Sequence, residues 1–106
     1  MNIMKIMQQA KAMQGKMSDI QDKLAQTAVT GSAGGGAVSI TMTCKGYVQA
    51  VSIKQGVIDP TDPTMLEDLV KAAINDARQK ADDTTESETK SAMSGLGLPS
   101  DFKLPF

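Results

Sequence analysis

Apolar residues at the start of the chain repeat with the spacing of an α-helix. Between residues 2 and 27 they recur at alternating steps of three and four positions, as Ile3, Ile6, Ala10, Met13, Met17, Ile20 and Leu24. This a/d heptad pattern predicts a long helix over residues 1–28 with one apolar seam. Gly15 falls on the outward side of that helix, away from the seam. Because so short a chain has little else to cover the seam, we favour a partner helix over packing within the same domain.

A glycine-rich segment follows the predicted helix. Residues 30–36 read TGSAGGG, which predicts a flexible break between two elements. Adjacent glycines also occur in phosphate-binding loops, but such a loop needs Lys and Ser or Thr directly after the glycines, at the start of a helix. Here Ala37, Val38 and Ser39 follow instead. They begin a strand, so we interpret the segment as a connecting loop.

The next pattern has the two-residue period of a β-strand. Val38, Ile40, Met42 and Cys44 alternate with serine and threonine, which predicts a strand with one buried face.

Lys45-Gly46 then predicts a two-residue turn in which glycine adopts a positive φ. Residues 47–54 return as a second strand, with Val51 and Ile53 on one face. We therefore expect hairpin strands within residues 29–54. Two strands alone are marginally stable, so an extension at Val29-Thr30 or strands from a second subunit would help.

A second helix is predicted over residues 64–92. Asp62 suits the capping position and Pro63 the first helical position. The apolar positions keep helical spacing, at Met65, Leu66, Leu69, Val70, Ala73, Ile74, Ala77 and Ala81. The stretch after Ala81 has almost no apolar face, so we expect it to be solvated or held by another chain. Residues 93–106 are predicted to form an extended tail.

These elements predict a single α+β domain over residues 1–106, with a small antiparallel sheet. The chain has 106 residues and eight Met, but only two Phe, one Tyr and no Trp. Few bulky side chains are available for a core in a domain of this size, so we expect oligomerisation. The residues expected in the core or at a dimer interface are Ile40, Met42, Val51, Ile53, Leu66, Leu69 and Ile74.

The composition excludes several kinds of chemistry. With no His and a single Cys, the chain lacks the residues for a His-based acid/base pair, a His/Cys metal cluster or an internal disulfide. The adjacent carboxylates Glu67/Asp68 and Asp82/Asp83 point about 100° apart on a helix and do not converge. We expect no enzyme activity, no metal and no cofactor. No apolar run approaches the ~18 residues that span a bilayer, so we expect a cytoplasmic protein without a membrane partner.

The charge is nearly balanced overall but uneven along the chain. Lys and Arg total 11 against 12 Asp and Glu. Residues 1–63 hold six Lys and four Asp, and the first acidic residue is Asp19. The predicted first helix carries Lys5, Lys11, Lys16 and Lys23. Positioned cations are sufficient for phosphate contacts, but on charge alone we favour ordinary solubilising lysines.

Several segments together resemble the YbaB/EbfC family of small nucleoid-associated proteins. They are MKIMQQAKAMQGKM at the start, VTGSAGGGAVSITMTCKG leading to VSI, DPTMLEDLVKAAINDARQKA, and GLGLPSDFKLPF at the end. The last is the most specific, and the resemblance covers essentially the whole chain.

The resemblance implies a bacterial homodimer whose hairpins join into one continuous sheet, with long helices projecting like the arms of tweezers. Such proteins bind duplex DNA in the nucleoid with low sequence specificity, bend or compact it, and influence gene expression. The implied DNA-binding positions are the basic helix residues: Lys5, Lys11, Lys16 and Lys23, with Arg78 and Lys80 on the second helix.

A protein-interaction module is the alternative. In this hypothesis the Met-rich helix and the C-terminal tail engage a DNA-repair or replication protein, since Met-rich surfaces repack around varied partners. The net charge of −1 suits this class.

Overall fold

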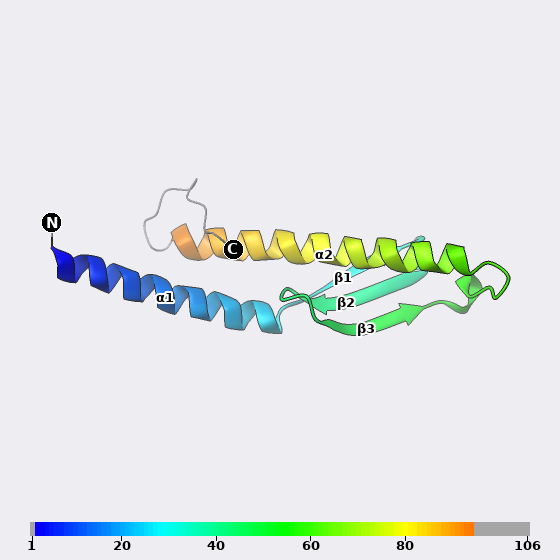
Figure 1. Ribbon diagram of the computed structural model, residues 1–106, viewed down its shortest axis with the longest axis horizontal. Helices are drawn as coiled ribbons and strands as arrows, with labels where there is room; N and C mark the ends of the chain where they lie inside the picture. Colours follow the sequence, from blue (N-terminus) through cyan, green and yellow to red (C-terminus); the bar gives the residue numbers. More distant parts are fainter. Residues whose placement is uncertain (1, 95–106) are drawn as a thin grey trace.

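The computed structural model describes residues 2–94. Its elements are α1 (Ile3–Gln26), β1 (Ala28–Ala33), β2 (Val38–Thr43), β3 (Val48–Ile53), a short 3₁₀ helix η1 (Gln55–Val57) and α2 (Pro63–Ser94). The strands form one antiparallel sheet in the order β1-β2-β3 (Figure 1). The α+β prediction is therefore confirmed. Helix α2 continues to Ser94, two residues into the predicted tail, and the remainder of that tail lies outside the described residues.

The molecule is elongated, measuring 70 × 23 × 17 Å. Helix α2 runs along its length and covers β1 and β2 on one face of the sheet, while α1 extends away from the sheet on the side where α2 ends (Figure 1). The two helices run in opposite directions. A compact sheet-and-helix body thus carries a helical arm.

Strand β1 corrects the prediction for residues 30–36. The segment Thr30–Ala33 is not a flexible break but pairs with β2, with Gly31 opposite Ile40. The turn is confined to residues 34–37, and its three glycines have positive φ, at 64°, 67° and 91° for Gly34, Gly35 and Gly36. The glycine-rich composition hid the strand, because glycine weakens a strand pattern when the sequence is considered alone.

Gly31 lets α2 lie directly against β1. A Cβ atom at this position would lie 2.1 Å from the backbone nitrogen of Ala77 and 2.6 Å from the carbonyl oxygen of Ala73. On the helix side the contact is made by small residues, and Ala73, Ala77 and Ala81 are buried. They form one core cluster with Val38, Ile40 and Met42 of β2, so the alternation predicted for that strand is confirmed.

The start of α2 follows the predicted local chemistry, and the β2–β3 turn does so in part. The predicted positive φ of glycine is present, but four residues, 44–47, separate the two strands instead of the predicted two. Gly46, in the β2–β3 turn, has φ of 95°. The pairing shifts by one residue near this turn, where Thr41 lies opposite Ala50 but Met42 lies opposite Val48. Helix α2 starts at Pro63, and the Asp62 carboxylate accepts a hydrogen bond from the Met65 amide at 3.3 Å. The predicted cap and first helical residue are confirmed.

The distal part of α2 contacts α1 of the same chain, which corrects the expectation that it is solvated or held by another chain. Ile20 and Leu24 of α1 are buried, and Met17, Cys44 and Ala92 pack against them. A salt bridge of 2.7 Å joins Lys23 and Glu88 beside this cluster. The C-terminal part of the α1 seam is therefore covered within the chain.

The close contact at Gly31 predicts a large effect of one methyl group. Gly31→Ala should destabilise the fold by about 3 kcal/mol, because the added Cβ collides with backbone atoms that cannot move alone. Gly15→Ala is the control. No atom lies within 4 Å of a Cβ there, so it should stabilise α1 by up to about 1 kcal/mol. Urea unfolding followed by circular dichroism measures both, and wild-type stability of Gly31→Ala would contradict the packing.

Candidate nucleic-acid interface

The first half of α1 is a basic segment without acidic residues. Asn2 caps the helix by accepting a hydrogen bond from the Met4 amide at 3.0 Å. Lys5, Lys11 and Lys16 follow on exposed positions, and no Asp or Glu occurs before Asp19. Within residues 2–94, none of the three lysines forms a salt bridge or a side-chain hydrogen bond. Their charges are available to an external anion.

The helical repeat places the lysines on two sides of α1. Lys5, Lys16 and Lys23 are separated by 11 and 7 residues, which brings them within about 20° of one another around the axis. Lys11 lies roughly 120–140° away from this row. The arm therefore presents a row of lysines along one face and a further lysine on another.

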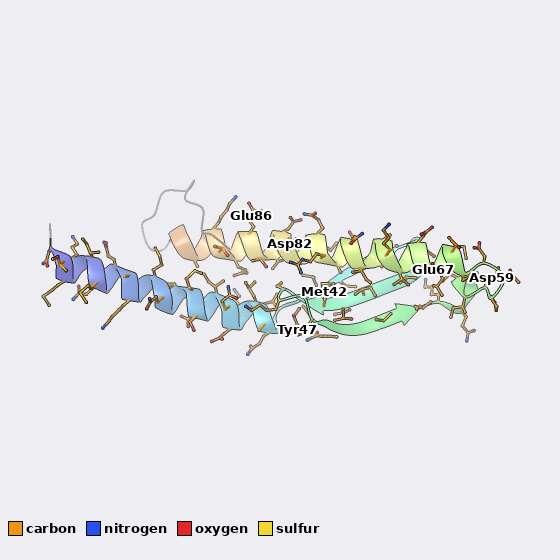
Figure 2. The ribbon with its side chains drawn as sticks, in the orientation of Figure 1. Met42, Tyr47, Asp59, Glu67, Asp82 and Glu86 are labelled. Atoms are coloured by element: carbon orange, nitrogen blue, oxygen red, sulfur yellow. The ribbon has the colours of Figure 1, made fainter. Side chains whose placement is uncertain are left out.

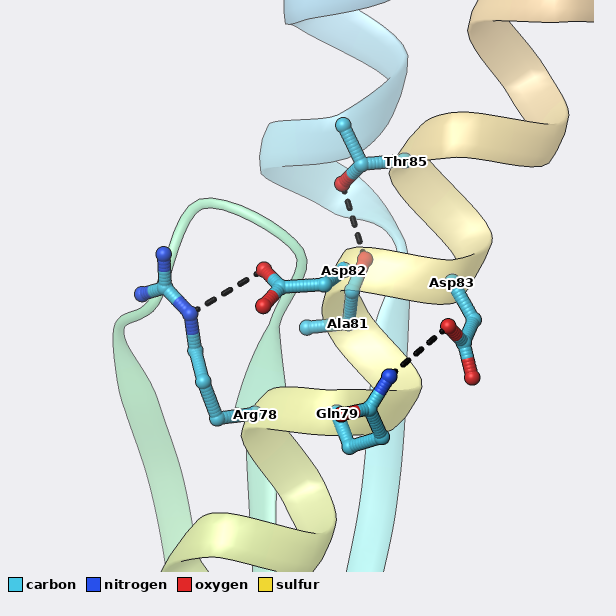
Figure 3. A network of polar contacts seen from close by, with 6 residues as sticks. All are labelled: Arg78, Gln79, Ala81, Asp82, Asp83 and Thr85. Carbon is cyan, nitrogen blue, oxygen red and sulfur yellow. Dashed lines mark hydrogen bonds and ion pairs between the residues drawn. The ribbon is translucent and has the colours of Figure 1, made fainter.

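The other predicted DNA-binding residues have partners within the chain. Lys23 pairs with Glu88. On α2, the Arg78 Nε atom lies 3.1 Å from the Asp82 carboxylate (Figure 3), and the Lys80 Nζ atom lies 3.3 Å from Asp76. The structure thus separates the predicted set into a free group in the first half of α1 and three paired residues, Lys23 at the end of α1 and Arg78 and Lys80 on α2. The Arg78 pair is exposed, and such pairs contribute little, so this guanidinium can exchange its carboxylate for a phosphate.

Helix α2 carries seven acidic and four basic residues. Asp82 and Glu86 project from this helix (Figure 2), and Asp83 accepts a hydrogen bond from Gln79 at 3.0 Å (Figure 3). Neighbouring carboxylates have different partners and do not converge. Within residues 2–94, no group of three His, Cys, Asp or Glu side chains could hold a metal ion. The excess of carboxylates lies on α2, whereas the first half of α1 carries lysines without any acidic residue.

The outer edge of β1 is closed by two side chains of α2, a feature that the sequence analysis missed. The Ser32 amide donates to Asp76 at 2.9 Å, and Lys80 donates to the Thr30 carbonyl at 3.1 Å. Alternate residues of an edge strand direct their backbone groups away from the neighbouring strand, so these bonds occupy groups that another strand would need. The only sequence signal was an Asp and a Lys four positions apart on a helix.

The other edge of the sheet is open and apolar. Helix α2 does not cover β3, and Val48 and Val51 are 52% and 55% exposed. Val51 lies opposite buried Ile40, so its side chain is on the helix-covered face of the sheet. Nearby, a groove of about 860 Å³ lies between α2 and the loop before it, lined by Ile58, Pro60, Pro63, Leu66, Val70 and Ile74 among others.

The residues expected in the core or at a dimer interface divide into three groups in one chain. Ile40 and Met42 are buried, whereas Ile53, Leu66 and Leu69 are half-buried beside the core. Val51 and Ile74 are exposed.

Comparison with known proteins identifies the family. The family model for the YbaB/EbfC DNA-binding family matches residues 1–96. The chain belongs to this family. A nucleoid-associated protein of Bartonella tribocorum is 46% identical over 98% of this chain and 97% of its own length. One of Rickettsia felis is 41% identical over 99% of this chain and 98% of its own length. YbaB/EbfC is a DNA-binding family.

A solved structure supports the fold. The crystal structure of an uncharacterized protein from Helicobacter pylori matches with a TM-score of 0.75 at 18% identity, covering 88% of this chain and 98% of that one. At this identity the match concerns the arrangement of helices and strands only. Neither α1 nor α2, as far as the structure describes them, is long and apolar enough to cross a membrane.

The bonds at the β1 edge predict a pH effect. The Ser32 amide, and then Lys80, lower the pKa of Asp76 below its ordinary value. This stabilisation is present above the unfolded-state pKa of about 3.9 and is lost as the pH falls through the lower folded-state value. Asp76→Asn should therefore lose less stability than the wild type between about pH 5 and about pH 2.

Urea unfolding at each pH measures this difference. Asp68→Asn, which changes an exposed carboxylate of the same helix, is the control and should follow the wild type. Parallel pH profiles for Asp76→Asn and the wild type would contradict the assignment.

Proposed function

We propose that a dimer of this chain binds duplex DNA with low sequence specificity through phosphate contacts, bends or compacts it in the bacterial nucleoid, and so influences gene expression. The observation that carries the proposal is the acid-free first half of α1 with its unpaired Lys5, Lys11 and Lys16. Membership of a DNA-binding family supports it.

The side chains of the arm suit phosphates better than base edges. Lysine acts as a compact point charge, whereas base discrimination in the major groove relies on side chains with matched donors and acceptors. The arm also lacks aromatic residues on which bases could stack. Contacts of this kind position a protein on DNA without reading its sequence. Low specificity is the expected consequence.

The open β3 edge of the sheet is suited to pairing with a second copy of the chain. Closure of β1 by Asp76 and Lys80 leaves β3 as the edge at which strands can be added. Pairing of β3 with its counterpart would continue the sheet across two subunits and cover Val48 and Val51. The dimer would carry two basic arms, and binding of DNA to both would give a means of bending or compacting it.

Removing one arm lysine tests the DNA interface. Lys11→Glu should weaken binding to duplexes of unrelated sequence alike, and lower the salt slope of log affinity by about 1 for one lost phosphate contact. Lys54→Glu makes the same charge change at an exposed position beyond β3 and should have a much smaller effect. Fluorescence anisotropy over a salt series measures both. Equal losses for the two variants would remove α1 from the interface.

A charge on β3 tests the dimer. Val51→Asp should shift the mass measured by sedimentation from dimer towards monomer, because the carboxylate would be buried in the new interface. Ser52→Asp places the same charge on the opposite face of the strand and should leave the dimer intact. A dimer of Val51→Asp as tight as that of the wild type would exclude β3 from the interface.

A further inference from the structure

The apolar seam of α1 is covered at one end only. Ile20 and Leu24 are buried against α2, whereas Ile3 is 73% exposed and Ile6 is 47% exposed. The a/d spacing places all of them on one face of the helix. The exposed part therefore continues an interface that already exists in the chain.

The covered and exposed parts meet where α2 ends. Lys23 of α1 pairs with Glu88 of α2. Closer to the end of α2, Met17 of α1 and Ala92 of α2 belong to the apolar cluster around Ile20 and Leu24. Helix α2 ends at Ser94, and α1 extends beyond that point (Figure 1). The chain thus leaves α2 beside the first uncovered turn of the α1 seam.

We propose that the segment 95–106 of the same chain lies on this exposed seam of α1, over Ile3, Ile6, Ala10 and Met13. This placement depends on the α1–α2 interface and not on the proposed DNA binding. The other possible occupant, a second copy of the chain, is an outcome of the test below.

The length of the segment suits this path. From Met17 to Ile3 is 14 residues, which is about 21 Å along a helix. The 12 residues after Ser94 reach about 40 Å when extended, so the segment can follow the seam to its end with length to spare.

The composition of the segment also suits the seam. It contains both phenylalanines of the chain and the leucines Leu96, Leu98 and Leu104, which supply the bulky apolar groups that the seam lacks.

Such an arrangement assigns different faces of α1 to different contacts. The row of Lys5 and Lys16 lies about 100° around the helix from the centre of the seam, so the covered arm still presents these lysines. Covering the seam would also stabilise α1 beyond the end of α2, where its helix has no other support within the described residues.

Disulfide trapping in the full-length chain tests the proposal. With the native thiol removed by Cys44→Ala, the pair Ile6→Cys and Phe102→Cys should form an intramolecular disulfide at least about tenfold faster than the pair Gln8→Cys and Phe102→Cys. Position 8 is the matched control, because it lies two residues on and about 160° around the helix. Non-reducing mass analysis distinguishes the products, and circular dichroism confirms that each variant folds.

Two outcomes overturn the proposal. Equal rates for the two pairs would show that the segment does not select the seam. A disulfide between two chains would assign the seam to a second copy.

Hydrogen exchange gives an independent measurement. Phe102→Ser with Phe106→Ser should speed amide exchange in residues 3–13 by about tenfold while leaving residues 20–26 unchanged. Lys103→Ser, within the same segment, is the control and should match the wild type. Unchanged exchange in residues 3–13 would contradict the proposal. Both experiments are done without DNA, so their failure is distinct from a failure of DNA binding.

Discussion

The rest of the structure depends on the direct contact between α2 and β1. Gly31 has no side chain, and the helix presents Ala73, Ala77 and Ala81, so the two backbones approach until a single methyl group would not fit. This contact fixes α2 along the sheet, and the side chains of β2 fill the space beside it. The same alignment carries the distal half of α2 past the sheet, where Ile20 and Leu24 of α1 pack against it. The position of the arm is therefore a consequence of packing in the body.

The same contact makes the two edges of the sheet different. Because α2 lies over β1, its Asp76 and Lys80 reach the outward backbone groups of that strand. Helix α2 does not cover strand β3, whose Val48 and Val51 side chains stay exposed. Unpaired strand edges are sites of association that proteins commonly block, and here one is blocked and the other is open. This asymmetry leaves the β3 side of the sheet for the second copy that we propose.

Charge is separated along the molecule in a way that the net value of −1 conceals. Several carboxylates of α2 form ion pairs or hydrogen bonds with side chains of the same helix. The lysines at the start of α1 have no acidic residue near them in the sequence. Phosphate binding depends on the local concentration of cations and not on the total. A nearly neutral chain is thus compatible with a DNA-binding family.

The sequence alone determined both helices, the β2–β3 hairpin, the cap at Asp62 and the positive φ at Gly46, because each depends on periodicity or on the chemistry of a few adjacent residues. The family could also be recognised from the sequence, because segments spread over the whole chain resemble it. Tertiary structure decided the remaining features. The sequence suggested an extension of the sheet at Val29-Thr30, which the structure has, but the rest of β1 was hidden because Gly31 is selected by contact with a distant helix and not by strand propensity. Arg78 and Lys80 pair with carboxylates four positions away on the same helix, which is a local spacing. The Lys23–Glu88 pair, the closed edge of β1 and the exposure of Val51 instead depend on residues brought together from far apart in the chain, which no local pattern encodes.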